Sequence, residues 1–166
     1  MDCKRVAVIG SGTMGRGIAH VAALAGYETH MFDIADDVLA KAKKAIEKNL
    51  QKGVDRGKVA AEAMASALEN LQTGTDLAAA AKGSDFIIEA VPEKLDLKRD
   101  IFSSLEANAP GHAVLATNTS TIPITQIADS VKEPERVIGM HFFNPVHIMK
   151  LIEIIKGSKT SDDTVS

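Results

Sequence analysis

The stretch Val6-Ala-Val-Ile-Gly10-Ser-Gly12-Thr-Met-Gly15 joins a short apolar run to three glycines spaced G-x-G-x-x-G, and an apolar helical pattern follows it. Gly10 permits a tight turn from strand to helix, Gly12 leaves the backbone open to close approach, and Gly15 lets the helix pack near the strand. The start of the helix offers free N–H groups and a positive dipole end to a pyrophosphate. The stretch therefore predicts the first strand, turn and helix of a dinucleotide-binding domain.

An acidic residue stands where such a domain needs one. Glu28 to Asp33 has the pattern of a second strand, and Asp33 follows Gly10 at about the 20-residue distance typical of the carboxylate that binds the adenosine ribose. A carboxylate there repels a 2′-phosphate, and Ile34 and Ala35 supply no arginine to neutralise one. The sequence thus predicts NAD as the cofactor. The alternative is that Asp33 caps the following helix, a role for which Asp36 and Asp37 compete.

The composition is that of an ordinary globular domain, with 166 residues, 45% of them hydrophobic and 25% charged. A net charge of −3 supplies no basic field, so no nucleic-acid partner is expected. Cys3 is the single cysteine, which excludes an intramolecular disulfide and favours a reducing compartment. No apolar run approaches the roughly 18 residues of a membrane span, and no signal peptide is recognisable. We expect a cytoplasmic protein with no membrane partner and no metal site.

Strands and helices alternate along the rest of the chain, which predicts an α/β fold: a Rossmann-type doubly wound, mostly parallel sheet. The pattern indicates helices over 36–52, 58–69, 76–82, 95–108 and 124–130, and strands over 70–73, 84–91, 113–117, 136–141 and 150–155. The helices within about 36–70 form an inserted helical hairpin, and Gly53 is expected to end the first of them.

The last residues have the composition of a helix start, because Thr160 and Ser161 are followed by Asp162 and Asp163. We expect residues 1–160 to form the NAD-binding domain and 161–166 to be the truncated start of a helix that leads into a further domain. A frayed natural tail is the alternative.

Polar groups follow three of the predicted strands, at 89–93, 118–121 and 141–144, and in an open α/β sheet ligands bind outside these carboxyl ends. Of the five histidines, only His141 ends a strand there, which makes it the candidate general base. If the strands on either side of the 144–145 turn are paired, Glu153 can lie beside His141 and fix its tautomer. The alternative is a histidine satisfied within the core. His20 is expected to be a packing or surface residue of the first helix, and His112 to be exposed.

Five motifs stand in order along the chain: Gly10-Ser-Gly-Thr-Met-Gly15-Arg-Gly-Ile-Ala, Ile88-Glu-Ala-Val-Pro-Glu93, Thr117-Asn-Thr-Ser120, Gly139-Met-His-Phe-Phe-Asn-Pro-Val146 and Met149-Lys-Leu-Ile-Glu153. Together they resemble the 3-hydroxyacyl-CoA dehydrogenase family. The resemblance covers the chain in order from Val6 to about Ile155. The stretch that contains His141 is much more specific than the glycine motif, and the helical hairpin is also expected of this family.

The resemblance implies roles for particular residues. His141 would be the catalytic base, Glu153 its partner, and Ser120 a contact to substrate and nicotinamide. The expected NAD-binding residues are Gly10, Gly12, Thr13, Met14, Gly15, Asp33, Ala90, Val91, Glu93, Lys98, Asn118, Ser120 and Asn144. Weak candidates for the CoA contacts lie in the hairpin, at Asn49, Lys52 and Arg56.

The resemblance also implies an acyl-CoA substrate and a further, C-terminal helical domain that closes the cleft and forms a homodimer, and we expect residues 1–166 to end before this domain. Two other functions stay open from the sequence. One is a hydroxyacid or sugar-nucleotide dehydrogenase on the same fold, which typically uses a lysine base in a second domain. The other is a module that binds NAD without turnover, since a half-open cleft admits water.

Overall fold

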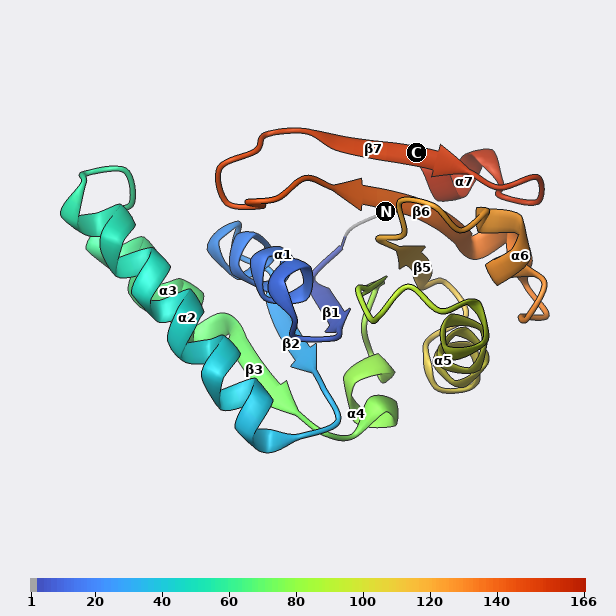
Figure 1. Cartoon of the computed structure of the whole chain (residues 1–166), viewed down its shortest axis with the longest axis horizontal. Coiled ribbons are helices and arrows are strands. Elements are labelled where there is room, and N and C mark those ends of the chain that lie inside the picture. The colour runs from blue at the N-terminus through green and yellow to red at the C-terminus, as the bar shows by residue number, and fades with distance from the viewer. Residues whose placement is uncertain (1–2) are drawn as a thin grey trace.

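A computed structural model describes residues 3–166, and its centre is a seven-stranded sheet with the order β3-β2-β1-β4-β5-β6-β7 (Figure 1). The strands are β1 (Arg5–Ile9), β2 (Glu28–Phe32), β3 (Leu71–Gly74), β4 (Phe86–Glu89), β5 (Val114–Thr117), β6 (Val137–Phe142) and β7 (Ile152–Lys156). Only β7 runs antiparallel, paired with β6. The doubly wound, mostly parallel sheet predicted from the sequence is confirmed.

Helices cover both faces of the sheet. They are α1 (Thr13–Leu24), α2 (Asp36–Asp55), α3 (Ala61–Asn70), α4 (Leu77–Ala81), α5 (Leu95–Asn108), α6 (Ile124–Ala128) and α7 (Asp162–Val165), with a 3₁₀ turn at Pro134–Arg136. Alternate residues of β1 divide between two cores. Val6 and Val8 pack with α1, α2 and α3, whereas Ala7 and Ile9 pack with α4, α5 and α6. Because both faces are buried, the central strands are almost wholly apolar.

The strand order places the topological switch point between β1 and β4, because the chain leaves β1 toward β2 and β3 and returns to the other side of β1 with β4. The carboxyl ends of the parallel strands β1, β4, β5 and β6 therefore lie at one edge of the sheet, and an open α/β sheet binds its ligand in the crevice outside this edge.

The α2–α3 hairpin is present, but the expectation that Gly53 ends its first helix is wrong. α2 continues to Asp55, and the residue that ends it is Gly57, whose φ of 65° suits glycine and whose N–H donates to the Val54 carbonyl at 2.9 Å. A Cβ on Gly53 would lie 2.7 Å from Cγ2 of Val59. Gly53 thus serves the close packing of the hairpin turn.

Two strands begin two residues later than expected. β7 begins at Ile152 and not at residue 150, because the chain after β6 forms a turn in which Ile148 and Met149 donate to the Pro145 carbonyl. β4 begins at Phe86, since Ser84 still donates its hydroxyl to the Ala80 carbonyl of α4. At the end of the chain, Ser161 caps α7 by accepting the Thr164 N–H.

His20 on α1 is a packing residue. It is 4% exposed, and its ring stacks on that of His147 in the turn after β6, with centroids 5.3 Å apart. Burial, with a smaller contribution from the charge of His147, lowers the pKa of His20 from 6.5 to about 4. The folded chain therefore holds this imidazole neutral at ordinary pH.

We expect the free energy of unfolding to fall as the pH is lowered from 6.5 to about 4, because in this window the unfolded chain binds a proton on His20 that the folded chain excludes. Each pKa unit corresponds to about 1.4 kcal/mol, so the loss would reach about 3 kcal/mol. Urea unfolding at about pH 5 and about pH 7 should show a smaller pH dependence in His20→Gln. Equal pH dependence in the two proteins would contradict this assignment.

Candidate active site

The glycine turn between β1 and α1 forms one side of the crevice. Gly10 has a φ of 100°, and a Cβ on it would lie 2.8 Å from the Ala90 carbonyl oxygen. A Cβ on Gly15 would lie 1.8 Å from the Gly10 oxygen, so both positions require glycine. A Cβ on Gly12 would meet nothing within 4 Å. This open space, beside exposed Thr13 and half-buried Met14, is where a pyrophosphate can approach the uncapped start of α1.

Asp33 follows β2 and faces this turn. Its Oδ2 accepts hydrogen bonds from the Ser11 N–H at 2.8 Å and the Ser11 hydroxyl at 2.6 Å, and its Oδ1 accepts from the Ile34 N–H at 2.7 Å. Ala35 precedes α2 without a side-chain cap, and Asp36 and Asp37 lie in the first turn of the helix. The alternative that an aspartate caps α2 is therefore wrong for all three residues. The carboxylate is held at the glycine turn, as ribose recognition requires.

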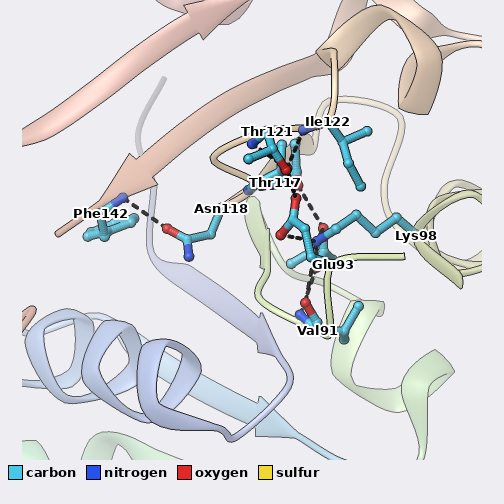
Figure 2. Close-up of polar contacts among 10 residues, drawn as sticks. Val91, Glu93, Lys98, Thr117, Asn118, Thr121, Ile122 and Phe142 are labelled. Atoms are coloured by element: carbon cyan, nitrogen blue, oxygen red, sulfur yellow. Dashed lines mark hydrogen bonds and ion pairs between the residues drawn. The ribbon is translucent and has the colours of Figure 1, made fainter. Parts of the chain in front are cut away.

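The end of β4 carries a buried ion pair. Glu89 and Lys98 are 0% and 1% exposed, and the Lys98 ammonium lies 2.7 and 2.9 Å from the two Glu89 carboxylate oxygens. Glu89 also accepts the Val91 N–H and the Thr117 hydroxyl, both at 2.7 Å. Lys98 donates in addition to the Val91 carbonyl at 3.4 Å (Figure 2). Such full hydrogen bonding is what makes a buried pair of charges tolerable.

This pair places Lys98 below the crevice surface. All three donors of its ammonium have protein acceptors, whereas Ala90 and Val91 are half-buried and Glu93 is exposed at the rim. Sequence reasoning grouped 89–93 but did not find the Glu89–Lys98 contact. The only signal was a carboxylate at the end of an otherwise apolar strand.

The segment after β5 forms the opposite rim. The Asn118 side-chain oxygen accepts the Phe142 N–H at 2.9 Å and so ties the end of β5 to β6, as Figure 2 shows. Thr119 is 2% exposed and donates its hydroxyl to Glu93, while Ser120 is exposed beside it. The structure thus brings Asn118, Ser120 and Glu93 to the same edge of the sheet.

His141 and Glu153 lie directly opposite each other in the β6–β7 pair. His141 Nδ1 is 2.9 Å from Glu153 Oε2. Because a carboxylate only accepts, Nδ1 carries the proton, and the lone pair is on Nε2. The His141 side chain is 21% exposed, which excludes a histidine sealed in the core. The exposed Asn144 follows β6. The geometry is that of a histidine base oriented by a carboxylate.

The three candidate CoA residues are not part of this crevice group. Asn49 is half-buried on α2, and Lys52 is exposed in the last turn of that helix. Arg56 directly follows the end of α2 at Asp55. Figure 1 shows the α2–α3 hairpin extending away from the sheet, with its turn at the outer end.

Within residues 3–166 no group of three or more histidine, cysteine or acidic side chains could hold a metal ion. No helix in that part of the chain is long and apolar enough to cross a membrane.

The sheet order, the glycine turn and the placement of Asp33 define a dinucleotide-binding domain. Residues 5–166 match the family profile of the 3-hydroxyacyl-CoA dehydrogenase NAD-binding domain. The chain belongs to this family, and its cofactor is NAD.

Individual relatives agree with the family match. The mitochondrial hydroxyacyl-coenzyme A dehydrogenase of Rattus norvegicus is 43% identical over 166 residues, which cover 97% of this chain and 53% of the relative. A crystal structure of 3-hydroxybutyryl-CoA dehydrogenase from Escherichia coli is 44% identical with a TM-score of 0.97, over 99% of this chain and 35% of that one. A crystal structure of (S)-3-hydroxybutyryl-CoA dehydrogenase from Ralstonia eutropha is 37% identical with a TM-score of 0.94, over 98% of this chain and 57% of that one. The chain spans about a third to somewhat over half of these relatives.

Proposed function

We propose that this chain forms the NAD-binding part of an enzyme that interconverts (S)-3-hydroxyacyl-CoA and 3-ketoacyl-CoA. The contact between His141 Nδ1 and Glu153 Oε2, at 2.9 Å beside the crevice, carries this proposal. The names of the relatives support the substrate class. The further residues that the relatives contain would complete the acyl-CoA side of the site and form a homodimer.

The crevice residues fit NAD. The open face of Gly12 and the start of α1 would hold the pyrophosphate, and Asp33 would accept the adenosine ribose hydroxyls. Ala90, Val91, Glu93, Asn118 and Asn144 would line the nicotinamide half, with Lys98 beneath them. NAD, when bound, supplies the acceptor for the hydride that leaves C3 of the substrate.

The proton of the same reaction is handled by the chain. His141 Nε2 would take the proton of the 3-hydroxyl, and the Glu153 carboxylate would stabilise the imidazolium that forms. Ser120 would hold the substrate oxygen by a hydrogen bond. The protein then contributes orientation and proton transfer, while the hydride chemistry belongs to the cofactor.

Asp33→Asn is expected to weaken NADH binding by roughly 10- to 100-fold and to reduce the preference for NADH over NADPH, because the charged acceptor of the ribose hydroxyls is lost. Fluorescence titration with both nucleotides measures the preference. Asp37→Asn is the matched control, since Asp37 is an exposed residue in the first turn of α2. An unchanged preference in Asp33→Asn would remove Asp33 from this role.

The substrate class is tested by NADH oxidation with acetoacetyl-CoA and, separately, with free acetoacetate, using a protein that carries this chain together with the further residues of its relatives. We expect turnover with the thioester and little with the free acid. The reverse preference would instead favour a dehydrogenase of free hydroxyacids. For this chain alone we expect NADH binding with little turnover.

A further inference from the structure

Thr119 is a buried residue to which the proposed function assigns no part in binding or catalysis. It lies in the turn after β5 and is 2% exposed, and its hydroxyl both donates and accepts hydrogen bonds. The hydroxyl donates to Glu93 Oε1 and accepts the N–H groups of Ile122 at 3.0 Å and Thr121 at 3.3 Å. Figure 2 labels these three partners. One side-chain atom therefore joins the turn after β4 to the turn after β5.

Each of the two turns depends on this hydroxyl. The Glu93 side chain is 42% exposed, and its other polar neighbours are more distant: the Thr121 hydroxyl at 3.4 Å and the Lys98 ammonium at 3.8 Å. Thr119 is thus the closest hydrogen-bond donor that orients the Glu93 carboxylate. On the other side, the bonds from Thr121 and Ile122 close the short turn in which Ser120 stands.

The contacts of Thr119 complete a closed ring of hydrogen bonds and ion pairs at the edge of the sheet. The Thr119 N–H donates to the Thr117 hydroxyl at 3.3 Å, and Thr117 donates to Glu89. Lys98 forms ion pairs with both Glu89 and Glu93 and so closes the ring. Only a side chain that both donates and accepts can make these contacts of Thr119; serine can make them and valine cannot.

We propose that Thr119 is a positioning residue that fixes the Glu93 carboxylate and the Ser120 turn relative to each other. The cofactor side and the substrate side of the crevice are thereby held in one geometry. This inference rests on the proposed contact of Glu93 with the cofactor and acts through Glu93, so Thr119 itself need not touch NAD or substrate.

The test is calorimetric titration of this chain with NADH, with the thermal midpoint measured alongside. Thr119→Val removes the hydroxyl at nearly constant volume and is expected to weaken NADH binding by roughly 5- to 20-fold, because a hydrogen bond to a charged group is lost. Thr119→Ser keeps the hydroxyl and should bind within about twofold of the unaltered chain, as hydrogen-bond rescue requires. Thr119→Ala serves as the second variant if the valine variant does not fold.

A double-mutant cycle and a control make the result specific. In a Glu93→Ala background, Thr119→Val should add little further loss, because its effect passes through Glu93. Thr125→Val is the matched control: the Thr125 hydroxyl bonds to Ser158, away from the crevice.

The possible outcomes separate the two proposals. Unchanged binding in Thr119→Val, with weaker binding in Glu93→Ala, would overturn the inference alone. Equal loss in the valine and serine variants would overturn it as well, because packing and not the hydroxyl would then matter. Unchanged binding in both Thr119→Val and Glu93→Ala would overturn the inference together with the proposed Glu93 contact.

Discussion

His141→Gln is expected to lower the rate of NADH oxidation with acetoacetyl-CoA by about 10²–10⁴-fold, the usual effect of removing a general base. The substituted amide cannot take the proton of the 3-hydroxyl, and the carboxylate of Glu153, 2.9 Å from Nδ1 of the native imidazole, would have no imidazolium to stabilise. NADH affinity should change little, since His141 acts on the substrate proton. The measurement is steady-state turnover in a protein that carries this chain and the further residues of its relatives.

His112→Gln is the control for this experiment. His112 is also a histidine paired with a carboxylate, at 3.0 Å from Asp85, but it precedes β5 at the opposite edge of the sheet. Its replacement should leave turnover nearly unchanged. Less than a tenfold loss in His141→Gln would exclude His141 as the base.

Gly12→Ala is expected to weaken NADH binding by about 100-fold or more and to leave the fold intact. A Cβ at this position meets no protein atom within 4 Å, so the folded chain accommodates it. The same methyl group would occupy the space through which the pyrophosphate approaches the backbone N–H groups at the start of α1. Calorimetric titration with NADH and a thermal melt, with a midpoint within about 2 °C of the unaltered chain, are the two measurements.

Gly111→Ala is the matched control, because a Cβ on Gly111 also meets nothing within 4 Å and the residue lies between α5 and β5. Both variants should melt like the unaltered chain, and only Gly12→Ala should lose NADH. If Gly12→Ala binds NADH as tightly as Gly111→Ala and the unaltered chain do, the pyrophosphate does not approach the chain at Gly12.

Those parts of the fold that depend on short-range pattern were predictable from the sequence. The run from β1 through the glycine turn to β2 combines strand periodicity, turn glycines and helix periodicity in one continuous stretch. The opposition of His141 and Glu153 was predictable only as a possibility, because two strands joined by a turn can pair antiparallel; their register, with the nine residues 143–151 between them, is given by the structure.

Contacts between distant segments could not be predicted in this way. The sequence does not reveal that Gly53 packs on Val59, so it was mistaken for the end of a helix. The burial of His20 depends on His147, which comes from a turn at the other end of the chain. The Glu89–Lys98 pair and the Thr119–Glu93 contact likewise depend on how the ends of neighbouring strands meet. Each of these is a tertiary contact, whereas sequence pattern reports local preference and burial.

NADH and NADPH titration of this chain by calorimetry tests the central claim most directly. We predict one NADH site with a dissociation constant in the micromolar range and much weaker binding of NADPH, because the glycine turn and Asp33 are both complete within the chain. The absence of saturable NADH binding, or equal affinity for the two nucleotides, would contradict the cofactor site on which the proposed function depends.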